Sequence, residues 1–277
     1  MRLYKANVIA LFTLPIICWP STAAELGDTP VLFNIEELMV GDHRSAQNIA
    51  RNKFRNPVET LNFFGLTPDM TLIEIGPSGA WYTEILAPYM RELGRYYGAH
   101  FSPNSDNEFQ RRSLESFETK IGSNPDLYGK AVIRHLLPPN EVAIGPLEGA
   151  DIALTFRNVH NWMARDEDED FFNAFFAALK PGGILGVVEH RAPDSASRQE
   201  MIDSGYVSEA FVIGIATKAG FEFIGSSEVN ANPKDTKDHP EGVWTLPPSF
   251  RMGDNNREKY SAIGESDRMT LKFRRPE

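Results

Sequence analysis

Short hydrophobic runs alternate with longer amphipathic stretches along most of the chain. The runs have the length and composition of strands, and the amphipathic stretches repeat their apolar residues at helical spacing. Residues 184–190 form a nearly continuous apolar run, as expected for a strand buried on both faces. Strands that alternate with helices favour parallel pairing, so the pattern predicts a doubly wound, mostly parallel α/β sheet. The seven predicted strands are residues 71–75, 95–101, 131–136, 151–156, 184–190, 221–229 and 269–275.

Helices are predicted between these strands and ahead of the first one. Residues 34–65 predict a cap of two helices, and the second has Pro57 in its first turn, where proline is tolerated. The basic residues of this cap are Arg44, Arg51, Lys53 and Arg55. The other predicted helices are residues 81–93, 107–121, 167–179 and 206–219.

A long polar segment, residues 230–267, separates the last two predicted strands and is rich in Pro, Asp, Asn and Gly. A segment of this length in a compact domain is typically a lid or a binding loop. The chain length suits one domain. We therefore expect a single domain over residues 25–277, with the cap, a core at 66–229, the lid loop and a last strand at 268–275.

The N-terminus has the pattern of a secretory signal. Arg2 and Lys5 precede an apolar run at residues 8–19, and small residues follow at 21–24; this order is typical of a cleaved signal. The run is shorter than the roughly 20 apolar residues of a membrane span. We expect removal of residues 1–24 and a mature protein in the periplasm, or alternatively secreted, with no stable membrane insertion. A buried N-terminal helix is the other interpretation.

Composition and charge limit the classes of binding partner that the protein is expected to have. The formal net charge of -10 disfavours binding to nucleic acid and to anionic membrane surfaces. Cys18 is the only cysteine, so the mature chain would have no disulfide and no cysteine ligand for a metal. We therefore expect a small-molecule substrate and no nucleic acid, and the composition carries no signal for an oligomeric state.

The first predicted strand runs into a glycine-rich turn. The stretch LIEIGPSGAWYTEIL contains Glu74, Gly76 and Gly79, followed by a predicted helix. Glycine permits a tight turn and a close approach of the backbone, and a helix N-terminus offers free N–H groups. These features are typical of a nucleotide-binding loop, although an ordinary strand-to-helix turn would show them too.

Polar and aromatic side chains gather where the fourth and fifth strands end, which is the edge where open α/β sheets bind ligands. We favour His160 as a general base because an imidazole titrates near physiological pH. Glu189 or His190 is the second choice; since neighbours on a strand face opposite ways, both would line one pocket only if the strand ends between them. Further candidates for substrate binding are Asn161, Trp162 and Arg191, and in the lid Asn232, Asp235, His239 and Trp244.

Several blocks resemble the class I S-adenosylmethionine-dependent methyltransferases. DIALTFRNVHNW resembles the fourth-strand motif of that family, and ALKPGGILGVVEH its fifth-strand motif. More narrowly, GAWYTEILAPY, LTFRNVHNW, LKPGGILGVVEHR and NANPKDTKDHPEGVWTLPP resemble a group of exported, predicted methyltransferases, over nearly all of residues 40–275. The resemblance implies S-adenosylmethionine as cofactor and methyl transfer to a small molecule outside the cytoplasm. It implies cofactor contacts for Glu74, Gly76, Ser78, Gly79, Trp81, His100, Arg157 and Asn158.

The chain departs from the family pattern at two places. Methyltransferases commonly have glycine where Ser78 and Ala80 stand, and an acid that holds the ribose hydroxyls where His100 stands. A histidine can hydrogen-bond a hydroxyl but lacks the two acceptor oxygens of a carboxylate. The adenine would lie near Arg134 or His135.

Two alternatives stay open. The protein could bind a small ligand without catalysis, or it could be a metal-assisted enzyme. Histidines and carboxylates are suitable ligands, but neither an H-x-x-x-H nor an H-E-x-x-H spacing occurs, so we expect no metal. The residues considered as ligands are His43, His160, His190, His239, Glu189, Asp235 and Asp238.

Overall fold

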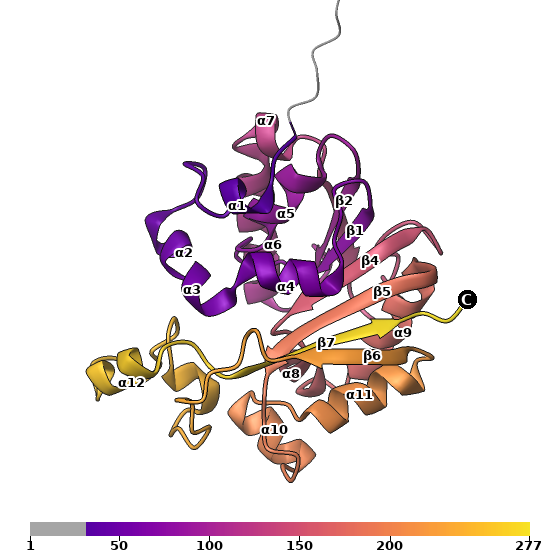
Figure 1. Ribbon diagram of the computed structural model, residues 1–277. Coiled ribbons are helices and arrows are strands. Elements are labelled where there is room, and N and C mark those ends of the chain that lie inside the picture. Colours follow the sequence, from indigo (N-terminus) through magenta and orange to yellow (C-terminus); the bar gives the residue numbers. More distant parts are fainter. Residues whose placement is uncertain (1–31) are drawn as a thin grey trace, which may run out of the picture. The chain divides into compact units, whose positions relative to one another are not determined.

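Seven strands form one sheet in the computed structural model (Figure 1), which describes residues 32–277. The strand order is β3-β2-β1-β4-β5-β7-β6, and only β7 runs antiparallel to its neighbours in this sheet. The predicted doubly wound, mostly parallel sheet is therefore confirmed, whereas the predicted signal peptide, residues 1–24, lies outside the described residues. The strands are β1 (Thr71–Ile75), β2 (Arg95–Phe101), β3 (Val132–Leu136), β4 (Ala150–Phe156), β5 (Leu179–His190), β6 (Glu222–Ser227) and β7 (Arg268–Arg274).

Strand β5 is longer than predicted. It begins at Leu179, which pairs with Ala150 of β4, and a register shift in β4 separates this pair from the next one. Residues 180–183 therefore continue the strand instead of ending the preceding helix as a separate turn.

The cap consists of short helices instead of the two predicted. They are α1 (Ile35–Leu38), α2 (Ala46–Ala50), α3 (Asn52–Arg55) and α4 (Pro57–Phe64). Asn56 separates α3 from α4 because its backbone is left-handed, with φ at 39°. Pro57 occupies the first turn of α4, as predicted, and Gly65 ends it with φ at 81°.

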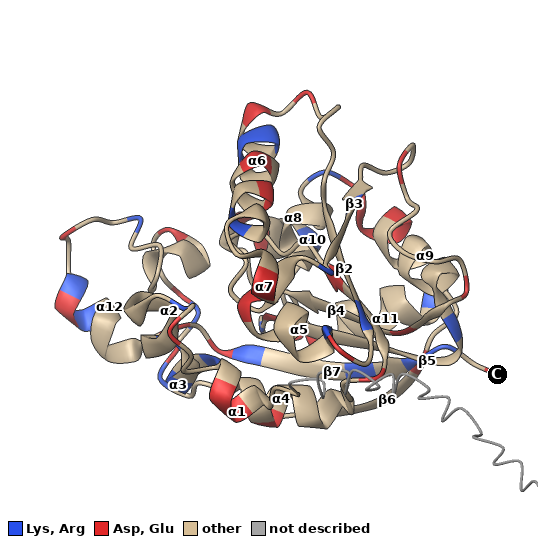
Figure 2. Ribbon diagram, turned by 90° about the horizontal axis from the view of Figure 1, so that it is seen from above, with Lys and Arg blue, Asp and Glu red and all other residues tan. Residues whose placement is uncertain are grey.

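The other helices alternate with the strands. Four short helices, α7, α8, α10 and α12, were not predicted, although Ser197 and Glu200 form a capping box at the start of α10 that is visible in the sequence as S-x-x-E. Figure 2 shows acidic and basic residues along α6, which corresponds to the helix predicted at residues 107–121. The helices are α5 (Thr83–Met90), α6 (Glu108–Gly122), α7 (Pro125–Tyr128), α8 (Val159–Met163), α9 (Asp168–Ala178), α10 (Arg198–Ser204), α11 (Glu209–Lys218) and α12 (Arg257–Ile263).

Helices cover both faces of the sheet (Figure 1), and two hydrophobic cores fill the space between them. On β1, Ile73 and Ile75 belong to one core and Leu72 to the other, because successive side chains of a strand point to opposite faces. Helices α5 and α6 pack on the face of Leu72, and α9 and α11 on the opposite face. In the part of the chain that the structure describes, no helix has both the length and the hydrophobicity of a membrane span.

The segment at residues 230–267 is packed more closely than a solvated lid. It contains a 3-10 helix, η1 (Gly242–Thr245), and the helix α12. Asn230 at its start is buried, and its amide donates to the hydroxyls of Thr60 and Thr270 at 2.9 Å each. The segment is thus attached to the cap and to β7, which a composition rich in proline and charge did not predict.

The chain order reverses between β1 and β4, since β2 and β3 lie on one side of β1 and β4 on the other. Such a switch point leaves a crevice outside the carboxyl ends of the two strands, where open α/β sheets bind ligands. Gly76 follows β1 and Arg157 follows β4. The fold therefore brings the glycine-rich turn and the predicted catalytic stretch to one edge.

Candidate functional site

Three cavities meet at the turn that follows β1. The β2 cavity has a volume of about 290 Å³ and contains His100 in its wall. The arginine cavity, about 200 Å³, is lined by Arg55 of the cap. The histidine cavity, about 220 Å³, is lined by His160. Ser78 lines all three, so the turn is where ligands in the three cavities would come together.

The turn keeps a backbone that suits glycine even where the sequence has other residues. Gly76 has φ at 61°, Ser78 at 49° and Ala80 at 62°. Each non-glycine residue in this left-handed region costs roughly 1–2 kcal/mol. The two positions where methyltransferases commonly have glycine are therefore the two that carry this strain. A Cβ at Gly79 would meet no atom within 4 Å, which leaves room above the turn.

Asn158 ties the end of β4 to the end of β1. Its amide nitrogen donates to the carbonyl of Ile75 at 2.9 Å and to the hydroxyl of Thr155 at 3.1 Å. A Cβ at Gly76 would lie 2.8 Å from this nitrogen, so the contact requires glycine there. Asn158 also lines the β2 and histidine cavities.

Glu74 supports the turn from inside the fold. Its carboxylate is buried and accepts hydrogen bonds from the hydroxyls of Thr83 at 2.7 Å and Tyr96 at 2.6 Å. Burial raises the pKa of Glu74 to about 7, although the two hydrogen bonds oppose the rise. Glu74 borders the arginine cavity, but its hydroxyl partners hold the carboxylate.

Replacing this carboxyl should change the pH dependence of stability. Because the pKa of Glu74 is higher in the folded protein, at about 7, than its ordinary 4.5, its contribution is present below pH 4.5 and is lost as the pH rises through 7. We expect the free energy of unfolding of Glu74→Gln, relative to that of wild type, to increase by about 3 kcal/mol as the pH rises from about 4 to about 8. Chemical denaturation at several pH values measures this, with the exposed Glu115→Gln as control. Parallel curves for Glu74→Gln and wild type would contradict the raised pKa.

His100 faces the β2 cavity as a hydrogen-bond donor. Its Nδ1 accepts the backbone N–H of Phe101 at 2.8 Å, and burial lowers the pKa of His100 to about 4. The neutral ring therefore carries its proton on Nε2, which is buried and makes no well-aligned hydrogen bond among residues 32–277, although the backbone of Ser78 lies close enough to raise the pKa of the ring. On β3, Leu136 lines this cavity, whereas neither of the predicted adenine neighbours, Arg134 and His135, does.

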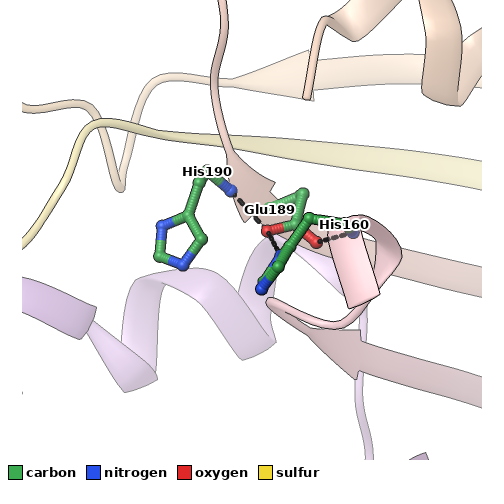
Figure 3. Close-up of side chains that lie close together, drawn as sticks. All are labelled: His160, Glu189 and His190. Atoms are coloured by element: carbon green, nitrogen blue, oxygen red, sulfur yellow. Dashed lines mark hydrogen bonds and ion pairs between the residues drawn. The ribbon is translucent and has the colours of Figure 1, made fainter. Parts of the chain in front are cut away.

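His160 lines the histidine cavity and forms a hydrogen-bonded pair with Glu189, which lies behind it and does not line the cavity (Figure 3). Nδ1 of His160 lies 3.1 Å from Oε1 of Glu189, and both side chains are buried. Oε2 of Glu189 accepts the backbone N–H of Val159 at 2.7 Å, at the start of α8. The carboxylate thus fixes Nδ1–H of His160 and leaves Nε2 of the ring for a ligand.

His190 lines the same cavity as His160, with their ring centroids 5.4 Å apart. Its Nδ1 lies 2.5 Å from the hydroxyl of Ser266. Burial lowers the pKa of His190 well below its usual range, so the ring is neutral. Strand β5 includes both Glu189 and His190, so it does not end between them, and of the two only His190 lines the cavity; Glu189 acts on the site through His160.

These three residues are also the one described group that could hold a metal ion. His160, Glu189 and His190 each offer one ligand atom, all within 4.8 Å of one another. However, Glu189 already accepts the backbone N–H groups of Val159 and His190, both at 2.7 Å, and interacts with His160. The carboxylate is therefore better placed to orient His160 than to coordinate a cation.

A cluster of arginines surrounds Glu265 beside the arginine and histidine cavities. Glu265 pairs with Arg51 at 2.6 Å, Arg55 at 3.2 Å and Arg268 at 3.3 Å. Arg157 has φ at 62° and lines the arginine and histidine cavities. Of these residues, only Arg157 was predicted to contact a ligand. The density of basic residues in the cap was the available signal for Arg51 and Arg55, whereas no local signal indicated Glu265 and Arg268.

The predicted tryptophans have different surroundings. Trp81 lines the arginine cavity, and the guanidinium carbons of Arg44 and Arg55 lie 4.6 and 4.5 Å from its ring centroid. Trp162 lines the β2 cavity and stacks on Phe171, with centroids 4.3 Å apart. Trp244 lines the histidine cavity. All three are thus at the site, but Trp81 is held by the cap.

Asn161 lines both the β2 and the histidine cavity, whereas other predicted substrate contacts lie elsewhere. Arg191 pairs with Asp267 and with two glutamates, and the backbone N–H of Asn232 donates to Asp267. Asp235 is buried and pairs with His239 at 2.8 Å. His239 borders a separate surface groove of about 470 Å³. Arg191, Asn232 and Asp235 therefore anchor the segment at 230–267 instead of lining the three cavities.

Comparison with known proteins defines the fold. No protein-family model matches the chain, and no curated protein matches it. Among solved structures, an S-adenosylmethionine-dependent methyltransferase from Aquifex aeolicus is similar, with a TM-score of 0.53 and 15% identity over 88% of this chain and 99% of that chain. The [4+2]-cyclase SpnF has a TM-score of 0.55 and 15% identity over 86% of each chain.

A third similar structure is the S-adenosylmethionine-dependent methyltransferase SibL, with a TM-score of 0.50 and 15% identity over 82% of this chain and 56% of that chain. The fold is that of class I methyltransferases. A likeness at this identity defines the fold, and a fold hosts more than one function, as the cyclase among these structures illustrates. Function has to be argued from the site.

Proposed function

We propose that this protein transfers a methyl group from S-adenosylmethionine to a small-molecule acceptor. The observation that carries the proposal is the meeting of the β2 cavity and the histidine cavity at the glycine-rich turn, at the switch point of a class I methyltransferase fold. One cavity offers a place for a nucleoside, and the other offers a histidine that can act as a base. Both cavities are lined by Ser78 of the turn and by Asn158 and Asn161, which follow β4.

The residues of the β2 cavity fit the cofactor. The buried Nε2–H of His100 lies near the backbone of Ser78 but makes no well-aligned hydrogen bond in the described chain, so it can donate to a ribose hydroxyl, which replaces the acceptor role of the usual acid. The positive φ of Gly76, which lines this cavity, allows a ligand to approach the backbone of the turn. Asn158 and Asn161 add amide groups to the same wall.

The cofactor, when bound, supplies a methyl group on a positively charged sulfur. His160 would take on Nε2 the proton that the acceptor loses, once the methyl–sulfur bond is exchanged for a bond to the acceptor and S-adenosylhomocysteine is left as the other product. Glu189 holds Nδ1–H of His160 at 3.1 Å and would stabilise the imidazolium that forms. General bases of this kind contribute roughly 10²–10⁴-fold to a rate.

Calorimetric titration of residues 25–277 with S-adenosylmethionine and S-adenosylhomocysteine tests the cofactor. We expect micromolar affinity for both. If the folded protein bound neither at millimolar concentration, the protein would have the methyltransferase fold but bind a different ligand, and the proposed function would be wrong. Binding with no turnover of any acceptor would favour a ligand-binding protein.

Filling the space above the turn tests whether the cofactor occupies the β2 cavity. Gly79 lines the arginine cavity and not the β2 cavity, and a leucine side chain there would enter the arginine cavity without meeting protein atoms at its Cβ. We therefore expect Gly79→Leu to bind S-adenosylhomocysteine with an affinity close to that of wild type. Gly122→Leu is the matched control, because Gly122 also has open space at its Cβ and lies at the end of α6. A loss of affinity of about 10-fold or more in Gly79→Leu alone, which is about 1.4 kcal/mol, would place part of the cofactor in the arginine cavity and contradict its assignment to the β2 cavity.

A metal-assisted reaction is a second candidate, because His160, Glu189 and His190 lie close enough to share an ion. Metal analysis of the purified protein separates the two functions. A stoichiometric metal that is lost in His190→Ala would favour the second. Binding of S-adenosylhomocysteine by protein without stoichiometric metal would favour the first.

We further propose that the reaction takes place outside the cytoplasm. The support is the signal-like sequence of residues 1–24. Mass spectrometry of protein from the periplasm of an expressing cell would then give a chain that starts at Glu25.

A further inference from the structure

Charge is unbalanced where the arginine and histidine cavities join. Four arginines, Arg51, Arg55, Arg157 and Arg268, share one carboxylate, that of Glu265. The side chains of Arg55, Arg268 and Glu265 are 1%, 3% and 4% exposed, whereas Arg51 is 18% exposed and Arg157 is half-buried, so water screens little of the charge next to Glu265. Buried charge without a partner is unfavourable, and the excess therefore requires compensation.

Several of the guanidinium groups also lack hydrogen-bond partners. Nη2 of Arg51 and Nη1 of Arg55 are buried and unpaired among residues 32–277. Both side chains line the arginine cavity. The guanidinium of Arg157 makes neither a hydrogen bond nor an ion pair within this part of the chain, and it lines both cavities. By contrast, each guanidinium nitrogen of Arg268 has a partner, since it donates to the carbonyls of Phe54 and Ser266 and to the carboxylate of Glu265.

Glu74 does not neutralise the arginines. It borders the arginine cavity, but Thr83 and Tyr96 hold its carboxyl group. Burial raises the pKa of Glu74 to about 7, so much of it is protonated at neutral pH. The pKa of Arg157 is lowered to about 10, mainly by burial. The charge of Glu265 opposes this decrease, and the charges of Arg268 and Arg51 add to it.

We propose that this junction binds an anionic group, a carboxylate or a phosphate, that belongs to the methyl acceptor. The group would lie between the unpaired N–H groups of Arg55 and the guanidinium of Arg157, as planar guanidinium groups suit both anions. Its position next to the histidine cavity places the rest of the acceptor beside His160. The proposal rests on the proposed methyl transfer for the identity of the molecule, but not for the presence of the anion site.

The cofactor does not account for the excess charge. S-adenosylmethionine has one carboxylate, one ammonium and one sulfonium group, so even with its carboxylate at the arginines two of the three extra guanidinium charges would remain. An acceptor with its own anionic group reduces the excess and gains affinity from charge-assisted hydrogen bonds. The enzyme would then select small acids or phosphorylated small molecules over neutral ones.

Thermal unfolding of residues 25–277 tests the site with inorganic phosphate and with acetate, each against chloride at equal ionic strength. We expect at least one anion to raise the melting temperature, by on the order of 3 °C at ten times its Kd. The rise should persist at saturating S-adenosylhomocysteine and be lost in Arg157→Gln. Arg112→Gln is the matched control, since Arg112 is 69% exposed on α6 and carries the same charge.

The outcomes of this experiment distinguish an anion site for the acceptor from a site for the carboxylate of the cofactor and from the absence of any anion site. A rise that disappears with saturating S-adenosylhomocysteine would assign the arginines to the carboxylate of the cofactor and overturn the proposal. No rise with either anion, or an equal rise in Arg157→Gln, would mean that no anion site exists. If S-adenosylhomocysteine itself gave no shift while phosphate did, methyl transfer would fail as the function and the anion site would stand.

Discussion

Glu265→Gln is expected to lower the free energy of unfolding by about 3–5 kcal/mol at pH 7, because breaking a buried ion pair leaves its partners uncompensated. Glu265 is the one carboxylate that pairs with Arg51, Arg55 and Arg268 in the described chain. Glutamine keeps the size of the side chain but turns an N–H group toward a guanidinium. The variant thus isolates the charge of Glu265.

The pH dependence gives this prediction a second test. The arginines lower the pKa of Glu265 to about 2, against the effect of burial and below its ordinary 4.5. Its stabilisation is therefore present above pH 4.5 and is lost as the pH falls through 2, so the deficit of Glu265→Gln should shrink over that interval. Denaturant unfolding at several pH values measures it.

Glu228→Gln is the matched control, since Glu228 also pairs with an arginine, Arg191, but is 67% exposed. An exposed pair of this kind contributes about 0–1 kcal/mol. If Glu265→Gln cost no more than Glu228→Gln, the buried arginines would have another source of compensation, and the charge excess inferred at the junction of the cavities would be wrong.

His160→Ala is expected to lower kcat by about 10²–10⁴-fold with an acceptor that the wild type methylates. The loss follows from removal of Nε2 as the proton acceptor, while the β2 cavity stays intact. Affinity for S-adenosylhomocysteine should therefore change little. Formation of S-adenosylhomocysteine over time measures kcat, and calorimetry measures the affinity in the same preparation.

Two further variants separate catalysis from packing. His135→Ala is the control, because His135 lies on β3 and outside the three cavities, and it should turn over like wild type. Glu189→Gln should lose less than His160→Ala, since the imidazole remains but loses its charged partner at 3.1 Å. Full turnover by His160→Ala would transfer the role of base to another group, with His190 the nearest candidate.

The strands and the glycine-rich turn were predictable because their signals are local. A buried strand needs a run of apolar residues, and the run at 71–75 fits β1 residue for residue. The turn was visible from Gly76 and Gly79. Its backbone was not: the left-handed conformations of Ser78 and Ala80 contradict what those residue types prefer, and they are imposed by the strand and helix on either side.

The short helices could not be predicted from periodicity, since four to seven residues, as in α7, α8, α10 and α12, barely exceed one or two turns. The segment at residues 230–267 was expected to be a lid loop because proline and charge are rare in cores. Buried contacts, such as those of Asn230 with Thr60 and Thr270, satisfy its polar groups instead.

The sequence by itself determined the class of fold, the glycine-rich turn and His160 as the favoured base, because each depends on residues close together in the chain. Only the tertiary structure decided that Glu189 and His190 share a site with His160, and that Arg55 of the cap meets Glu265. Those last two residues are 210 positions apart. No local pattern links charges at such a separation, since only the packing of cap against sheet makes them neighbours.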